Sequence, residues 1–129
     1  MPVTAEQVQQ ISPSALAYLG DSVYELYVRT YYLHPPKRSQ IYHRLVVAQV
    51  RAETQALHLQ SLTPHLNNIE LEIVRRGRNA TTGHPKRVKP AIYQQATGLE
   101  TLMGYLYLTN QGRLTQLLQE LKLEPNLDQ

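Results

Sequence analysis

Apolar positions recur along most of the chain with the spacing of helices. In the clearest stretch, residues 15–32, apolar or small residues repeat three, four and seven positions apart. The remaining positions of this stretch are also mostly uncharged, which is typical of a helix packed on most of its sides. Ser12 and Pro13 supply a cap and a first-turn proline before it, and the prolines after His34 cannot continue a helix. The pattern predicts one long buried helix ending near Leu33. Its predicted apolar face is Leu16, Leu19, Gly20, Val23, Leu26 and Tyr27.

Two further helical segments flank this one. A short helix is expected within residues 1–12, with Thr4 as a candidate cap. After Ser39, apolar residues step along one stripe as far as Leu62, and Gln55 lies on the same stripe. This stripe predicts a second long, unbroken helix over residues 39–62.

The second half of the chain repeats the helical pattern around one long interruption. Thr63 followed by Pro64 is a start signal for a third helix, and Gly77 is a stop signal for it near residue 76. No alternation of the kind found in strands is visible. The sequence therefore predicts an all-α fold, a helical bundle in a single domain over residues 1–129. The other predicted segments are a loop at 77–90, helices at 91–108 and 111–123, and a frayed tail at 124–129.

Composition narrows the class of protein. The chain has 129 residues, no cysteine, a formal net charge of +3 and no run of about eighteen apolar residues. Disulfides, thiolate metal sites and a membrane span are therefore not expected. The first ten residues lack the basic start and apolar core of a signal peptide, which favours a cytoplasmic or organelle-interior protein.

One carboxylate stands out in the first long helix. Asp21 follows Gly20 within a stretch that is apolar on most sides, where a carboxylate is costly unless it is paired, protonated or bound to a metal. It could be a satisfied structural group that bonds to a tyrosine hydroxyl or an arginine. A short, rigid carboxylate also suits a hard cation such as magnesium, and the only other aspartate is Asp128.

Glu100 repeats this situation on another apolar helix. It is the only charged residue between Ile92 and Leu108. A core ion pair with an arginine is one interpretation. Two such acids on two core helices favour a second one, in which Asp21 and Glu100 hold Mg²⁺ between the helices and activate water against a phosphodiester.

A basic segment lies between these helices. No Asp or Glu occurs between Ile73 and Leu99, whereas six of the chain's 13 Lys and Arg do. No aromatic residue lies between Ile73 and Ile92, so the segment lacks a stacking platform for single strands, and we expect contact with a duplex backbone. The alternative is an ordinary solvated loop. The candidate RNA contacts are Arg75, Arg76, Arg78, Asn79, His84, Lys86, Arg87 and Lys89.

Three motifs carry a resemblance to a known family. Residues 18–26, YLGDSVYEL, resemble the signature helix of the ribonuclease III domain. Residues 76–80, RGRNA, and 96–108, ATGLETLMGYLYL, are similar to Mini-ribonuclease III, the branch that has no separate double-stranded-RNA-binding domain. The resemblance covers about residues 12–120.

This resemblance implies an all-helical homodimer that cleaves double-stranded RNA with Mg²⁺ and matures the 23S ribosomal RNA precursor at a stem. Asp21 and Glu100 match the family's catalytic and metal-binding acids, and Tyr18 matches an aromatic residue that packs across the dimer axis. Two further acids of the larger enzymes are here Ala17 and Thr97, which predicts fewer protein ligands and more metal-bound water. A ribosomal protein on the substrate is a further candidate partner.

Two other functions remain open at this stage. Ala17 and Thr97 favour a non-catalytic RNA-binding scaffold or ribosome-assembly protein of the same fold. A helical dimer without a nucleic-acid role is less consistent with the acid-free basic segment. Glu25, one turn beyond Asp21, could support the metal site or form a salt bridge.

Overall fold

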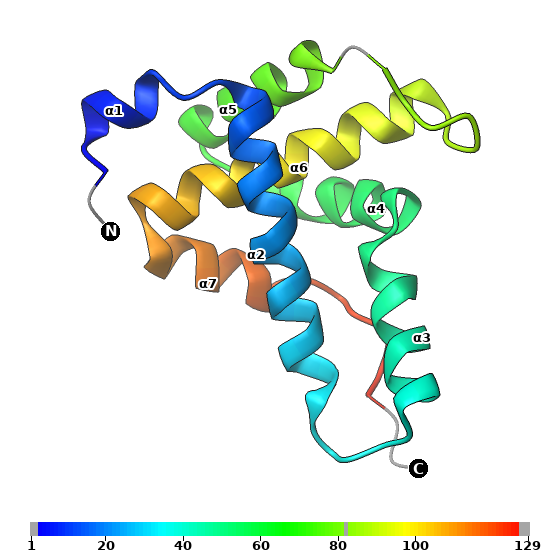
Figure 1. Cartoon of the computed structure of the whole chain (residues 1–129). Helices are drawn as coiled ribbons and strands as arrows, with labels where there is room; N and C mark the ends of the chain where they lie inside the picture. Colours follow the sequence, from blue (N-terminus) through cyan, green and yellow to red (C-terminus); the bar gives the residue numbers. More distant parts are fainter. Residues whose placement is uncertain (1–2, 82, 127–129) are drawn as a thin grey trace.

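The computed structural model describes residues 3–81 and 83–126, and the regular secondary structure in these ranges is entirely helical (Figure 1). The predicted all-α class is therefore confirmed. No helix in the described part of the chain is long and apolar enough to cross a membrane. The elements are α1 (Ala5–Gln9), α2 (Pro13–Leu33), α3 (Ser39–Val50), α4 (Ala52–Leu62), the 3₁₀ turn η1 (Thr63–His65), α5 (Asn68–Ala80), α6 (Pro90–Thr109) and α7 (Gln111–Gln119).

The helix pair α2 and α6 forms the centre of the molecule. In Figure 1, the N-terminal half of α2 crosses α6. A Cβ atom added at Gly20 would lie 1.7 Å from the carbonyl oxygen of Glu100, and one at Gly104 would lie 2.0 Å from that of Leu16. Glycine is required at both positions because the two backbones touch.

The buried face of α2 differs from the predicted one. Tyr24, Val28 and Tyr32 are fully buried, whereas Leu26 is 67% exposed. Of the predicted face, Leu16 and Gly20 are buried. The packed face therefore follows steps of four residues from Leu16. Tyrosine hydroxyls fit it because each finds an acceptor, as when Tyr24 donates to the carbonyl oxygen of Gln49 at 2.7 Å.

The predicted helix over 39–62 is wrong, because it is two helices. Arg51 is extended, with φ −73° and ψ 157°, and separates α3 from α4. Two side chains close the end of α3: the Thr54 hydroxyl donates to the carbonyl oxygen of Ala48 at 2.6 Å, and the Gln55 amide donates to that of Val50 at 3.0 Å. These local hydrogen bonds compete with continuation of the helix.

The prediction for the next helix is also wrong at both ends. Residues 63–65 form only the turn η1, and α5 starts after Asn67, whose side chain accepts from the backbone N–H of Glu70 in a capping box. Gly77 does not stop α5. A Cβ atom there would lie 2.3 Å from Thr101 Oγ1 on α6, so this glycine permits close packing of the two helices. The loop accordingly begins at Thr81 rather than at residue 77.

The C-terminal segment is held in place as far as it is described. Helix α7 ends at Gln119, earlier than predicted. The backbone oxygen of Glu124 accepts from the Tyr32 hydroxyl at 2.6 Å, and Asn126 donates to the backbone oxygens of Tyr31 and His34. Residues 124–126 are therefore attached to the end of α2 rather than frayed, and residues 127–129 lie outside the described part.

Candidate active site

The crossing of α2 and α6 brings the two predicted acids together. Asp21 follows the glycine that touches the backbone of Glu100, and its carboxyl group is near enough to raise the pKa of the Glu100 carboxyl group. Both line one hollow of about 440 Å³. Ala17 and Thr97 line the same hollow, so the positions that carry acids in the larger enzymes of the resembling family also face this site.

The two acids differ in their surroundings. We expected both to be buried, but Asp21 is exposed to solvent on α2, and only Glu100 is partly buried. Burial raises the pKa of Glu100 to about 8, with further contributions from the charge of Asp21 and from a hydrogen bond with it, while a hydrogen bond with Gln55 opposes the shift. The site therefore joins one solvated carboxyl group to one that is partly withdrawn from water.

No cation of the described residues pairs with either acid. The ion pairs in the described ranges join Arg29 with Glu25, Arg75 and Arg76 with Glu72, and Arg113 with Glu70. The alternative in which an arginine satisfies Asp21 or Glu100 is therefore not supported. Two adjacent carboxyl groups without a counter-ion repel one another when both are ionised, and a bound divalent cation would remove that repulsion.

The donor set fits a hard divalent cation that keeps much of its water. Carboxylate oxygens are the ligands that Mg²⁺ prefers, and Mg²⁺ usually retains several waters. Within the described ranges no group of three or more His, Cys, Asp and Glu side chains could hold a metal. Asp21 and Glu100 would therefore be the two charged ligands. Thr97 adds no charge, and its hydroxyl already donates to the backbone oxygen of Tyr93 at 2.9 Å.

The predicted RNA contacts fall into two groups. Arg75 and Arg76 lie on the exposed side of α5 and pair with Glu72, and the hydrogen bonds from Arg75 contribute most to lowering the pKa of Glu72 to about 2. The second group is exposed at the end of α5 and in the loop before α6. Its members are Arg78, Asn79, His84, Lys86, Arg87 and Lys89.

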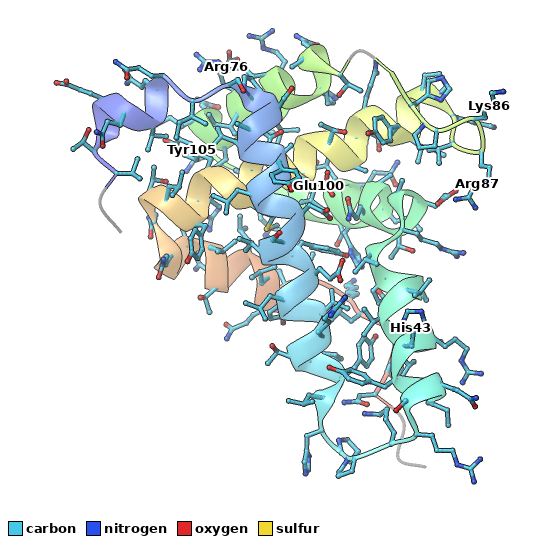
Figure 2. All side chains as sticks on the ribbon, viewed as in Figure 1. His43, Arg76, Lys86, Arg87, Glu100 and Tyr105 are labelled. Carbon is cyan, nitrogen blue, oxygen red and sulfur yellow. The ribbon has the colours of Figure 1, made fainter. Side chains whose placement is uncertain are left out.

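Figure 2 separates these groups in space. Lys86 and Arg87 extend from the loop at one side of the view, Arg76 lies on the other side of α2, and Glu100 lies between them. The hollow that holds the acids is also lined by Ala80, Thr81 and Gly83, where the loop begins. The loop group is thus continuous with the acid site, whereas Arg76 lines a different cavity of about 900 Å³ with Tyr105.

Two other predicted residues have clear positions. Tyr18 is 84% exposed and lines the hollow next to Asp21. Glu25 forms an ion pair with Arg29, one turn further along α2, which supports its interpretation as a salt-bridge residue.

Sequence reasoning missed Gln55, which is near enough to Glu100 to oppose the rise in the pKa of that carboxyl group. It lies in the first turn of α4 and is buried. The signal was a glutamine on an otherwise apolar stripe. A single helix over residues 39–62 does not predict the approach of Gln55 to Glu100, which depends on the break at Arg51.

Comparisons with known proteins show which proteins this chain is similar to. A family model described as Ribonuclease III domain matches residues 14–111. The Mini-ribonuclease 3 of Synechocystis sp. is 57% identical over 122 residues, which cover 95% of this chain and 85% of that protein. The Mini-ribonuclease 3 of Synechococcus sp. is 58% identical over 113 residues, which cover 88% of this chain and 82% of its own.

The fold has a counterpart among solved structures. The crystal structure of protein FN1578 from Fusobacterium nucleatum matches with a TM-score of 0.78 at 28% identity, covering 84% of this chain and 89% of that one. The region matched by the family model contains Asp21, Glu100 and the loop between α5 and α6. The resemblance of the three motifs is thereby confirmed over most of the chain, which is a member of the ribonuclease III family and of its Mini-ribonuclease 3 group.

Proposed function

We propose that this protein is a Mg²⁺-dependent endoribonuclease that cleaves double-stranded RNA as a homodimer. Endoribonuclease activity follows from membership of the family. The observation that carries the metal dependence is the pair of carboxyl groups, Asp21 and Glu100, which meet in one hollow without a cationic partner in the described chain.

The residues of the site have separate roles in this proposal. Asp21 and Glu100 would hold Mg²⁺, which when bound supplies an activated water and neutralises developing charge on the phosphate. The crossing at Gly20 fixes the spacing of the two acids, because neither backbone can move closer to the other. Thr97 and Ala17 leave room in the hollow for water where a further carboxylate would otherwise lie.

The loop group supports a duplex substrate. Lys86, Arg87 and Lys89 are exposed and lie outside every ion pair of the described residues. Such groups bind phosphates and read the shape of an A-form helix, whose deep groove hides the bases. From the family resemblance we propose a stem of the 23S ribosomal RNA precursor as the natural substrate. This role would place the protein in the cytoplasm, with a ribosomal protein on the stem as a candidate partner.

An exposed apolar stripe on α2 supports the homodimer. Tyr18, Leu26 and Leu33 are 84%, 67% and 61% exposed, and they are spaced eight and seven residues apart, close to one helix face. Exposed apolar stripes of this kind commonly mark a protein interface. A second copy of the chain would bury them and bring two acid sites onto one duplex. Light scattering of the wild type and of Leu26→Glu tests this, and a wild-type monomer would contradict it.

Cleavage of a long double-stranded RNA tests the catalytic proposal. We expect cutting with Mg²⁺ and none with EDTA. Loss of a group that only orients a metal ligand can lower activity by about hundredfold, so Asp21→Asn, which alters a proposed ligand itself, should lower the rate by at least that factor. Glu25→Gln is the matched control, since it removes an acid from the same helix that pairs with Arg29 instead.

Three outcomes decide between the candidates. Normal cutting by Asp21→Asn would remove this residue from the site. Binding of RNA without cutting, in the wild type and in the variant alike, would establish the non-catalytic scaffold, which the uncharged Ala17 and Thr97 favour. Preference for a transcript of the precursor stem over a duplex of unrelated sequence tests the natural substrate.

A further inference from the structure

Tyr93 lies in the same hollow as the two carboxyl groups, on the side of the basic loop. It is in the first turn of α6, on one helix face with Thr97 and Glu100, and all three residues line the hollow. Seven residues of helix place Tyr93 about 10 Å from Glu100 along α6. Thr81 and Gly83, where the loop begins, line the hollow too. A substrate that reaches from the two carboxyl groups to the loop therefore passes over Tyr93.

The wall of the hollow between these two ends is polar but uncharged. Apart from Asp21 and Glu100, the residues that line it carry no charge. Attraction of phosphates by charge therefore comes from the loop, and the wall can contribute hydrogen bonds. The hydroxyl groups available for them belong to Ser14, Tyr18, Thr81, Tyr93 and Thr97.

The Tyr93 hydroxyl is the one best placed to bind a substrate. Thr97 already donates to the backbone oxygen of Tyr93 at 2.9 Å, and Thr81 donates to that of Gly77 at 3.1 Å. Tyr18 belongs to the exposed stripe of α2 that a second copy would cover. The Tyr93 hydroxyl forms no hydrogen bond with a described residue, and its ring is half-buried. A tyrosine has only two side-chain torsions, so little entropy is lost when it binds.

The chemistry of this hydroxyl matches that of a ribose. A phenol hydroxyl both donates and accepts a hydrogen bond, and so does the 2′-hydroxyl of RNA. The 2′-hydroxyl groups lie along the wide, shallow groove of an A-form duplex, and they allow a protein to distinguish RNA from DNA. A phosphate, in contrast, only accepts hydrogen bonds and is bound more strongly by the cations of the loop.

We infer that Tyr93 is a specificity-determining residue, whose hydroxyl binds a 2′-hydroxyl of the RNA strand that is cut, a few nucleotides from the bond broken at Asp21 and Glu100. This inference rests on the proposed function, because it concerns the substrate of the same site. Tyr93 selects RNA over DNA by this hydrogen bond, whereas the loop binds either duplex by charge.

Two tyrosines of α6 provide the variant and its control. Tyr93→Phe removes the hydroxyl and keeps the ring. Tyr105→Phe makes the same change at another half-buried position of α6, whose backbone oxygen also accepts from a threonine hydroxyl four residues later. Tyr105 lines the other cavity, and Figure 2 shows it and Lys86 on opposite sides of Glu100.

The probes are synthetic duplexes that contain one mapped cleavage site. One duplex is entirely RNA. In each of the others, a single nucleotide near the site is replaced by its 2′-deoxy form, at equivalent positions of both strands, so that each site of a dimer meets the same change. Binding is measured with Ca²⁺ in place of Mg²⁺, and cutting of the all-RNA duplex is measured with Mg²⁺.

The 2′-deoxy change should weaken binding by the wild type at one position near the cleavage site, by about threefold to tenfold for each hydrogen bond lost. Tyr93→Phe should bind the all-RNA duplex more weakly by a similar factor. The 2′-deoxy change at that position should then have no further effect, because both changes remove the same hydrogen bond. Tyr105→Phe should keep the affinity of the wild type and its sensitivity to the 2′-deoxy change.

Each contrary result has a distinct meaning. Equal sensitivity of the wild type and Tyr93→Phe at every position would overturn the inference, because a loss caused by the shape of the duplex persists without the hydroxyl. A loss of less than about twofold in Tyr93→Phe, or an equal loss in Tyr105→Phe, would also overturn it. A wild type that cuts RNA and tolerates every 2′-deoxy position overturns this inference alone. A wild type that neither binds nor cuts double-stranded RNA overturns the proposed function itself.

Discussion

The crossing of α2 and α6 and the loop between α5 and α6 are built in opposite ways. At the crossing the backbones touch, so that a Cβ atom on Gly20 would lie 1.7 Å from the carbonyl oxygen of Glu100. In the loop, a Cβ atom on Gly83 would have nothing within 4 Å, and Lys86 and Arg87 are exposed. The two carboxyl groups thus have a fixed spacing, whereas the basic side chains of the loop have room to move.

This difference matches what each group would do in the proposed reaction. Carboxylates that share a cation must be held close to one geometry, and rigid helices do this better than loops. Contacts from Lys and Arg to phosphates act through charge and release of counter-ions, and they tolerate variation in position. Changes at the crossing should therefore affect stability and chemistry together, whereas changes in the loop should affect binding alone.

The largest expected effect comes from a methyl group at the crossing. Gly20→Ala forces the two backbones apart, and we expect it to lower the free energy of unfolding by about 3 kcal/mol, the upper end of typical overpacking costs. Gly83→Ala adds the same methyl group in the loop and should change that free energy by less than about 0.5 kcal/mol. Urea denaturation followed by circular dichroism measures both. Equal stability of the two variants would show that the crossing is not as rigid as its contacts indicate.

A smaller effect concerns the charge of Glu100 in protein without metal. Its pKa is raised from 4.5 to about 8, so the folded protein keeps a proton that the unfolded chain loses. The free energy of unfolding should therefore fall as the pH rises from about 4.5 to about 8, by about 2 kcal/mol once solvent screening is allowed for. Glu100→Gln cannot lose this proton and should lack that part of the pH dependence.

Denaturation in EDTA at several pH values between about 5 and about 8 checks this prediction. Glu25→Gln is the control, because Glu25 pairs with Arg29 on the outside of the same crossing helix. Added Mg²⁺ should stabilise the wild type more at the alkaline end of this range than at the acidic end, since the cation competes with the proton. Parallel pH curves for the wild type and Glu100→Gln would mean that Glu100 is ionised without metal.

Much of the fold could be predicted from local signals. Ser12 with Pro13 marked the start of α2, and the prolines after His34 marked its end. The break at Arg51 could not be predicted, because it depends on side chains that turn back to the end of α3 instead of on a helix-breaking residue. The sequence predicts the end of a helix at Gly77, whereas this glycine is needed for its contact with Thr101 on α6. That contact is tertiary and leaves no local signal in the sequence.

The site was predictable in part for the same reason. Asp21 and Glu100 were each unusual within an apolar helix, so that their approach to one another was predicted and is observed. Their catalytic role stays a prediction. The exposure of Asp21 depends on which side of α2 is packed, and the approach of Gln55 to Glu100 depends on the broken helix, so neither was visible in the spacing of residues.

The smallest effect on the fold, and the sharpest test of the comparison, belongs to the loop. Lys86→Ala combined with Arg87→Ala should weaken binding of double-stranded RNA and reduce the slope of log affinity against log salt by about two, or about one for each phosphate that the loop no longer neutralises. The free energy of unfolding should change by less than about 0.5 kcal/mol. Filter binding with Ca²⁺ in place of Mg²⁺, over a range of salt concentrations, measures the slope.

Arg75→Ala is the matched control for this double variant. It also removes an exposed positive charge, but Arg75 already donates two hydrogen bonds to Glu72. Glu72 stays paired with Arg76 in this variant, so the substitution removes one positive charge from α5 and leaves the basic residues of the loop in place. A change of slope in Arg75→Ala equal to that of a loop residue would place the duplex across α5. If the slope of log affinity against log salt is unchanged when Lys86 and Arg87 are both replaced by alanine, these loop residues do not bind the RNA. The proposed contrast between a rigid pair of carboxyl groups and an adaptable basic loop would then be wrong.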